Sequence, residues 1–474
     1  MKTDTIKKIL VSVILLYAIF SVSFYFLAGD NLKYKQSASN IAMFEADSIS
    51  PEIVDGLVIK QSFINKIDNI EQIALVFTKF YRDGIGSMKV ELLDGSNVLH
   101  SESFKVAGIP EQHRVFLNIE DPIREVGNKE LTLRISSNSE VDYGAALMMS
   151  SNEKNDGSVI RIGNRIVDGS ICFSVTGTDN IPISKYYWHI MTMVGLLISL
   201  VLFRSYSNYK HNRRDYIIAA INALFKYEFL ISQLVARDFK SKYKRSILGV
   251  FWSFLNPLLT MTVQFLVFST FFNADTNNYP VYLLSGVVCF SFFNECTTMC
   301  LSSISANSRL ITKVYIPKYI FPLARTISSS VNLFISLIPL ILACVLLSVQ
   351  IKPQAILFFY FLICLIAFSL GIGLFLSALM VFFRDIQFLW TVLIQIWMYA
   401  TPIFYPAEII PEKYKFIIRL NPLYHFIGNA RTCLINGISP EPSAYIFCLL
   451  FALGSLLIGS YTFIKTQDKF ALYL

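Results

Sequence analysis

The stretch RDFKSKYKRSILGVFWSFLNPL, residues 237–258, joins a strongly basic segment to a long apolar one. Its cationic side chains are Arg237, Lys240, Lys242, Lys244 and Arg245. Lys and Arg gather at the cytoplasmic ends of membrane spans, so the stretch predicts the cytoplasmic foot of a transmembrane helix. The composition agrees, because 54% hydrophobic content and 40 Phe in 474 residues exceed what a soluble protein covers with polar surface.

Apolar runs near the roughly 20 residues that a membrane-spanning helix needs recur along the chain. They lie at about 9–28, 186–203, 249–272, 282–304, 327–349, 355–383, 388–404 and 446–464. The sequence therefore predicts an α-helical polytopic membrane protein with eight spans. The apolar core of the first run is longer than that of a signal peptide, so we expect an uncleaved anchor at 1–28, with cleavage as the alternative.

Basic residues near the span ends set the expected orientation. The first span is preceded by Lys2, Lys7 and Lys8. The second span, at 186–204, ends at Arg204 and is followed by Lys210, Arg213 and Arg214. We expect a cytoplasmic N-terminus and a cytoplasmic linker with an amphipathic interface helix at 205–246. An even number of spans returns the C-terminus to the cytoplasm.

The segment at 29–185 has a different character. It holds 16 Lys and Arg against 22 Asp and Glu, whereas the remainder of the chain holds 25 against 11. Apolar and polar residues alternate at 88–92, 114–118 and 131–135, between turns rich in Gly, Asn and Asp. This period of two predicts an extracytoplasmic antiparallel β-sandwich or jelly roll, inserted between the first two spans.

A sandwich outside a membrane can bind sugars, since aromatic rings stack on sugar faces while charged and amide groups bind the hydroxyls. The candidates at expected loops and strand ends are Tyr81, Arg82, Asp83, His100, His113 and Tyr143. The alternative for each is a structural role, in which the side chain caps a strand or covers the core.

Five ordered motifs follow residue 216. They are Leu234–Lys240 with Tyr243–Gly249 and Trp252, Asn307–Lys313 with Pro317, Phe382–Ile386, Thr401–Pro406, and Asn421–Leu423. Together they resemble the permease subunit of ABC-2-type exporters, most closely those that export polysaccharides such as O-antigen, capsule or teichoic acid. The resemblance covers roughly the last 260 residues and implies a six-span permease at 247–474; the first two spans and the domain between them are additions to it.

The resemblance also implies partners: a homodimer of this chain, two copies of a separate ABC ATPase, and a lipid-linked polysaccharide of polyprenyl-diphosphate type in a bacterial cytoplasmic (inner or plasma) membrane. In the family, the loop matching 305–325 contains a coupling helix that seats in the ATPase. The residues expected to contact the ATPase are Asn307, Arg309, Leu310 and Lys313, with Arg237 and Lys240 from the basic helix. The alternative is that these charges only set the topology.

The chain itself lacks the residues for ATP hydrolysis. A phosphate-binding G-x-x-x-x-G-K-[ST] loop requires a Gly-Lys pair, and the sequence contains none. We therefore expect no catalytic site, no cofactor and no metal in this chain, with Mg-ATP bound by the partner ATPase. Of the eight Cys only Cys172 lies in the outer segment, and the others have no metal-ligand spacing.

Aromatic and intramembrane polar residues are candidates for the substrate path. Flat rings let a sugar polymer slide, and a carboxylate inside hydrocarbon must be paired or face water. The segment 399–426 holds four prolines and predicts a re-entrant gate at the outer mouth. The candidates are Phe290, Phe293, Glu295, Trp390, Trp397, Tyr399, Phe404, Tyr405 and Tyr424. The alternatives are core packing, an internal hydrogen bond for Glu295, and an interfacial aromatic belt.

The expected function is export of a lipid-linked polysaccharide, with the outer domain contacting glycan or an envelope partner. Two alternatives stay open: export of a non-glycan lipid or drug, and a membrane sensor or scaffold whose outer domain binds a ligand. No segment of the sequence indicates a nucleic-acid partner.

Overall fold

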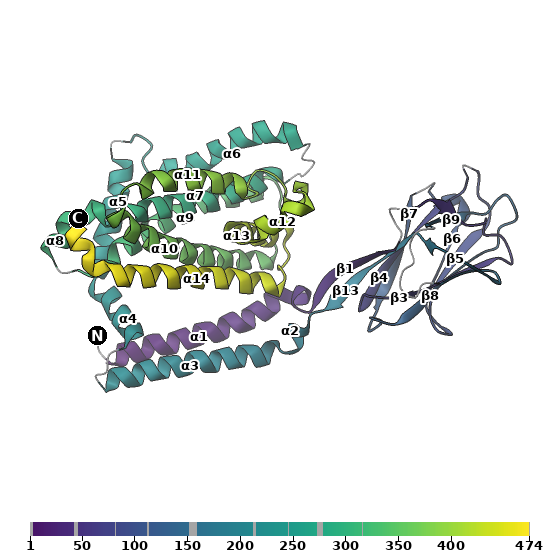
Figure 1. Ribbon diagram of the computed structural model, residues 1–474, viewed down its shortest axis with the longest axis horizontal. Coiled ribbons are helices and arrows are strands. Elements are labelled where there is room, and N and C mark those ends of the chain that lie inside the picture. Colours follow the sequence, from purple (N-terminus) through teal and green to yellow (C-terminus); the bar gives the residue numbers. More distant parts are fainter. Residues whose placement is uncertain are drawn as a thin grey trace. The chain divides into compact units, whose positions relative to one another are not determined.

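The computed structural model describes residues 3–41, 46–80, 82–110, 113–150, 159–211, 215–244, 246–272, 278–314 and 316–473. The chain divides into two compact units (Figure 1). The helical unit comprises Met1–Leu32 and Trp188–Leu474, and the β-domain comprises Lys33–Tyr187.

Helices form almost all of the helical unit. They are α1 (Thr3–Ala28), α3 (Tyr187–Lys210), α4 (Tyr216–Lys226), α5 (Glu228–Tyr243), α6 (Phe251–Phe272), α7 (Tyr279–Leu301), α8 (Ser308–Lys313), α9 (Ile320–Leu346), α10 (Phe358–Phe382), α11 (Ile386–Ala400), α12 (Glu412–Arg419), α13 (Pro422–Arg431), α14 (Pro442–Thr466) and α15 (Phe470–Tyr473). The short α2 (Pro182–Lys185) ends the β-domain.

Seven helical segments in the described part of the chain are long and apolar enough to cross a membrane. They are Ile6–Leu32, Tyr187–Lys210, Phe251–Ser269, Tyr279–Leu301, Ile320–Leu346, Pro353–Phe382 and Pro442–Tyr473. The remaining predicted span, at about 388–404, corresponds to α11, which has 15 residues and is about 22 Å long. It ends early because Thr401 precedes Pro402, and a residue before proline is pushed into the extended backbone that Thr401 adopts.

The core of the helical unit is built from close helix contacts. Helix α10 packs on both α14 and α7, and α7 packs on α9. At the crossing of α10 and α14, a methyl group on Gly459 would overlap the backbone carbonyl of Gly371. Glycine at this point lets the two backbones approach, as small residues do between membrane helices.

The first helix belongs to this bundle rather than standing apart. The Phe24 ring packs edge-on against Tyr445 with centroids 4.7 Å apart, and the Tyr17 hydroxyl donates to the Met191 carbonyl at 2.7 Å, which joins α1 to α3. Asn31 donates to the Ser439 carbonyl at 2.7 Å. In the helical unit, the chain's N-terminus, its C-terminus and α8 lie at one end, and α12 lies at the other (Figure 1).

The β-domain consists of two antiparallel sheets. Its strands are β1 (Tyr34–Ile41), β2 (Ser48–Ile49), β3 (Val58–Ile64), β4 (Asn69–Thr78), β5 (Ser87–Asp94), β6 (Asn97–Lys105), β7 (Arg114–Ile123), β8 (Glu130–Ser137), β9 (Ala146–Ser150), β10 (Val159–Ile162), β11 (Arg165–Val167), β12 (Ser170–Ile171) and β13 (Phe173–Asn180). The seven-stranded sheet has the order β1-β13-β4-β9-β12, with β2 on β9 and β7 on β4. The six-stranded sheet has the order β11-β10-β3-β8-β5-β6.

Alternating apolar residues of both sheets meet in one core. Ile59, Leu133 and Phe77 are fully buried there, and the rings of Phe63 and Phe173 from opposite sheets lie 5.0 Å apart. The structure is thus a β-sandwich, and residues that alternate with the core positions face outward.

Candidate functional site

Helix α5 presents two different faces. Asp238 and Lys242, four residues apart and hence on one side of the helix, point into the bundle. Asp238 pairs with Arg325 of α9 at 2.7 Å, and Lys242 pairs with Glu295 of α7 at 2.8 Å. These two ion pairs fasten the amphipathic helix to two membrane helices.

Glu295 is the centre of a polar junction. Its carboxylate accepts from Lys242 and also from the Asn332 side-chain amide of α9, at 2.6 Å. The Ser253 hydroxyl of α6 donates in turn to Asn332 at 3.4 Å. The structure therefore places Glu295 in a network of four helices, which compensates the cost of a carboxylate at membrane depth.

A third link runs from α5 to the turn before α8. The Arg237 guanidinium donates to the side-chain oxygen of Asn307 at 3.0 Å. Asn307 is buried, and its amide donates to the Ser303 carbonyl at 2.7 Å. Asn307 thus connects the loop to α5 from within the protein.

The side chains on α8 divide by role. Arg309 and Lys313 lie four residues apart and are exposed, and neither forms an ion pair within the described residues. Leu310 packs against a buried cluster that contains Ile311 and Phe321. The helix therefore anchors itself by its apolar side and presents two free cations at the end of the bundle that also holds both termini (Figure 1).

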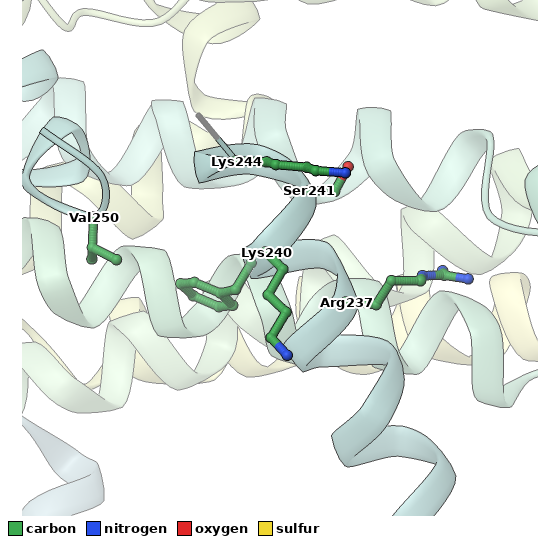
Figure 2. Close-up of a pocket in the computed structure, with 6 residues that line it drawn as sticks. Arg237, Lys240, Ser241, Lys244 and Val250 are labelled. Atoms are coloured by element: carbon green, nitrogen blue, oxygen red, sulfur yellow. The ribbon is translucent and has the colours of Figure 1, made fainter. Parts of the chain in front are cut away.

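The other face of α5 carries basic side chains and borders a cavity. A cavity of about 720 Å³ is lined by Arg237, Phe239, Lys240, Ser241, Lys244 and Val250. Figure 2 shows the basic side chains on successive turns of the helix, with Val250 reaching the cavity from the segment that follows. Lys240 and Lys244 form no ion pair among the residues that the structure describes. Arg245 of the quoted stretch lies outside the described residues.

Four of the predicted path residues come together in an aromatic cluster. Phe293 lies 5.3 Å from Trp397, 6.3 Å from Trp390 and 6.3 Å from Phe290, between ring centroids. All but Trp397 are buried. The indole Nε1 of Trp390 is buried with no hydrogen-bond partner in the described part of the chain. The rings pack on one another, so this cluster is part of the helical core.

The predicted gate region contains α12 and α13, joined to α11 by hydrogen bonds. The Trp397 indole donates to Asn421 at 2.8 Å, and the Asn421 amide donates to the Thr401 hydroxyl at 2.8 Å. Asn421 also caps α13, accepting from the Leu423 amide at 3.0 Å. One side chain thereby ties the end of α11 to the start of α13.

The aromatic gate candidates differ in exposure. Tyr399 is exposed, Tyr405 and Tyr424 are half-buried, and Phe404 is buried. The Tyr405 hydroxyl donates to the Tyr399 carbonyl at 2.9 Å. The candidates therefore do not form one continuous exposed surface.

Sequence reasoning missed Arg431, which holds the loop at 401–405. Its guanidinium donates to the carbonyls of Pro402 and Ile403 at 2.7 and 2.8 Å, and lies 3.5 Å from the ring centroid of Tyr282. The Tyr279 hydroxyl donates to the next carbonyl, Phe404, at 2.7 Å. Its position between two predicted membrane spans, shortly after the Asn421–Leu423 motif, was the available signal.

In the β-domain, two of the predicted ligand loops meet. Arg82 pairs with Asp142 at 2.7 Å, and the Ile85 amide donates to the Tyr143 carbonyl at 3.0 Å. Asp83 is exposed beside Arg82. This brings the loops carrying Arg82, Asp83 and Tyr143 together.

Three predicted residues remain: His113, His100 and Tyr81. His113 is exposed just before β7, and Tyr81 lies outside the described residues. His100 is half-buried on β6, 3.8 Å from Glu102. The pair of Arg82 and Asp142 is exposed, and surface ion pairs of this kind contribute little to stability.

Comparison with known proteins covers the helical half of the chain. The ABC-2 type transporter family matches residues 230–435. The O-antigen export system permease protein RfbA of Klebsiella pneumoniae is 30% identical over 246 residues, which are 51% of this chain and 93% of that protein. RfbA of Myxococcus xanthus is 27% identical over 54% of this chain and 99% of its own length. The polysialic acid transport protein KpsM of Escherichia coli is 22% identical over 48% of this chain and 90% of its own. With its seven long apolar helices and the network around α5, the chain belongs to the ABC-2 type transporter family, among the permeases of polysaccharide export.

Proposed function

We propose that this chain is the transmembrane subunit of an ABC exporter that moves a lipid-linked polysaccharide from the cytoplasm to the outside. A separate ATPase, in two copies on a homodimer of this chain, supplies the energy. The observation that carries the proposal is α8, a short helix that presents Arg309 and Lys313 to solvent and is tied to α5 through Asn307 and Arg237.

Coupling follows from these contacts. An ATPase seated on Arg309 and Lys313 displaces α8, and the Arg237–Asn307 bond passes the movement to α5. The pairs Asp238–Arg325 and Lys242–Glu295 pass it on to α9 and α7. Packed helices move as discrete bodies rather than deforming continuously, so the displacement reaches the aromatic cluster on α7 and α11.

The basic cavity on α5 supports the lipid-linked part of the proposal. Lys240 and Lys244 leave their charges unused within the described residues, while Arg237 adds a planar donor. Cations of this kind bind phosphate oxygens through charge-assisted hydrogen bonds. A diphosphate that links the polymer to its lipid would be held there before export begins.

The proposed topology places both termini, α5 and α8 in the cytoplasm, with residues 29–185 outside and an anchor at 1–28. The six-span permease at 247–474 then includes α11 as its short fifth span. Positive charges at the start of α1 and at the end of α3 support this orientation. Residues 399–426 form the outer gate, whose backbone carbonyls are held by Arg431 and Tyr279.

Co-purification tests the proposal. The protein is isolated from its native host, and ATP hydrolysis is measured for the wild type and for Arg309→Glu with Lys313→Glu. The control is Lys413→Glu with Arg419→Glu, an equal charge change on α12 at the opposite end of the helical unit (Figure 1). An ATPase that accompanies the wild type and the control but not the α8 variant supports the proposal. Absence of an ATPase from the wild type would overturn it.

A further inference from the structure

A row of charged side chains crosses the outer face of the six-stranded sheet. Arg161 of β10 lies opposite Lys60 of β3, Lys60 opposite Arg134 of β8, and Arg134 opposite Glu91 of β5. The preceding or following residues in these strands, such as Ile59 and Ile135, are fully buried in the core. Side chains alternate along a strand, so the whole row faces outward.

This arrangement costs stability in the unbound protein. Like charges directly opposite one another on neighbouring strands are destabilising, and Lys60 is flanked by an arginine on each side. Adjacent strands lie about 4.7–4.9 Å apart. Neither Lys60 nor Arg161 forms an ion pair within the described residues. The fold itself has no need of three adjacent cations here.

Glu91 neutralises only one end of the row. It pairs with Arg134 and, at 2.8 Å, with Lys89, and it is 5% exposed. Its single negative charge therefore pairs with two neighbouring cations, Lys89 and Arg134. It forms no ion pair with Lys60 or Arg161. Glu130, four residues from Arg134 on the same strand, lies about 13 Å away by strand rise.

The rest of this face carries hydroxyl side chains beside the row and exposed aliphatic side chains, Val159, Ile166 and Ile64, toward its margins, with no aromatic rings in the described strands. The outward positions beside the row carry Ser62, Thr132, Ser136, Ser101 and Ser103. Among the described strand residues of this sheet, no Phe, Tyr, Trp or His faces outward. Stacking on a neutral sugar is therefore not available on this face, whereas hydrogen bonds and charge are.

The opposite face of the domain differs. On the seven-stranded sheet, Gln72 donates to Asn118 at 2.6 Å, and the Thr176 hydroxyl donates to Gln72 at 3.3 Å. These three side chains hydrogen-bond one another on this surface. The domain has more acidic than basic residues overall, so the cationic row is a local concentration rather than a consequence of composition.

We propose that the outer face of the six-stranded sheet binds an anionic polysaccharide, a glycan that carries carboxylate or phosphate groups, through Arg161, Lys60 and Arg134. The acidic groups of successive sugar residues occupy the row and relieve its repulsion, while the hydroxyl side chains bind the sugar hydroxyls. Only one part of the inference rests on the proposed function: that the bound glycan is the exported polymer. Glycan binding itself does not depend on that function, because it is measured without transport.

The test uses the full-length protein in detergent, with polygalacturonate oligomers as the carboxylated probe and dextran oligomers of similar length as the neutral one. The variant is Lys60→Gln with Arg161→Gln. The control is Lys35→Gln with Arg114→Gln on β1 and β7 of the other sheet. We expect the wild type and the control to bind polygalacturonate but not dextran, and the variant to bind roughly tenfold or more weakly. Added salt should weaken binding to the wild type.

Equal binding by variant and control would overturn the inference, as would equal binding of dextran. Binding of phosphatidylglycerol vesicles through the same two residues, without polygalacturonate binding, would identify a membrane contact and also overturn it. Thermal unfolding gives an independent check, since Lys60→Gln relieves repulsion and should leave the β-domain at least as stable as the wild type. A clear loss of stability would mean that the row is structural.

The two proposals fail separately. If no ATPase co-purifies while polygalacturonate binding persists, the export function falls and the glycan site stands. If the ATPase co-purifies while neither probe binds, the glycan site falls and the export function stands.

Discussion

At the scale of single residues, Arg431 is the most demanding side chain in the helical unit. It is buried, no carboxylate pairs with it among the described residues, and its donors are used by two loop carbonyls and the Ser285 hydroxyl. Only a planar guanidinium reaches all of these acceptors at once. Its role in fixing the loop at 401–405 follows from that geometry.

We predict that Arg431→Lys lowers the melting temperature of the full-length protein. A lysine keeps the charge but leaves at least one buried carbonyl without a donor, at a cost of about 1–3 kcal/mol. Differential scanning fluorimetry in detergent measures the change, with Arg419→Lys on the exposed surface of α12 as the control. An Arg431→Lys protein that melts with the control would show that the loop does not depend on these bonds.

The second residue-scale prediction concerns Glu91. The pKa of its carboxyl lies below the ordinary value because Lys89, and then Arg134, stabilise the ionised form more than burial opposes it. A lowered folded-state pKa contributes stability above the unfolded pKa, and this stability is lost as pH falls through the folded value. The β-domain should therefore lose stability below about pH 4.5.

Calorimetry of the full-length protein between neutral and acid pH measures this loss. Glu91→Gln should reduce the stability at neutral pH and flatten the acid dependence of the β-domain transition. The control is Glu130→Gln on β8, which should keep the wild-type dependence. An unchanged acid profile in Glu91→Gln would assign the acid sensitivity to other carboxylates.

At the scale of elements, α5 is held to the bundle by its inner face. Asp238 is nearly buried and Arg325 is 16% exposed, so breaking this pair leaves a poorly solvated charge, at a cost of about 3 kcal/mol or more. We predict that Asp238→Asn increases amide hydrogen exchange throughout α5, measured by mass spectrometry on the full-length protein. Glu228→Gln, an exposed change in the first turn of the same helix, should leave exchange unchanged. Equal protection in both variants would contradict the anchoring role.

The crossing of α10 and α14 gives a second element-scale prediction. Gly459→Ala forces a methyl group against the Gly371 carbonyl, and overpacking of this kind costs roughly 1–3 kcal/mol. Gly454→Ala on the same helix meets no atom within 4 Å, and alanine favours the helix, so stability should hold or rise. Melting temperatures of the two variants should separate; if they coincide, the helices do not need the close approach.

At the scale of the whole molecule, β1 and β13 make excision of the sandwich feasible. They pair along their full length, with Tyr34 opposite Asn180 and Ile41 opposite Phe173. The chain therefore enters and leaves the rest of the domain at neighbouring points, a few ångströms apart across one antiparallel ladder.

Replacing residues 42–172 by a short Gly-Ser linker should keep the helical unit intact. We expect the variant to retain its ATPase partner and to lose polygalacturonate binding, measured by the same co-purification and binding assays. The helical unit has its own core, which the excision leaves untouched. Loss of the ATPase in this variant would mean that the β-domain takes part in coupling.

The sequence by itself determined the membrane class, the position of the long helices, the alternating strands of the β-domain and the family. Hydropathy and periodicity are local properties, and ordered motifs need no knowledge of contacts, so the seven long apolar helices coincide with runs that hydropathy alone locates. The length of α11 was overestimated because apolar residues continue beyond the point where Pro402 ends the helix.

Only the tertiary structure decided which charges meet. Lys242 finds Glu295, Arg431 finds the carbonyls of Pro402 and Ile403, and Arg161 lines up with Lys60 across a strand register. The partners are separated by tens of residues in the sequence. A register shift of one residue would point the side chains of the cationic row into the core. Which buried charge is compensated, and which surface charge has no partner among the described residues, depends on packing that no local pattern records.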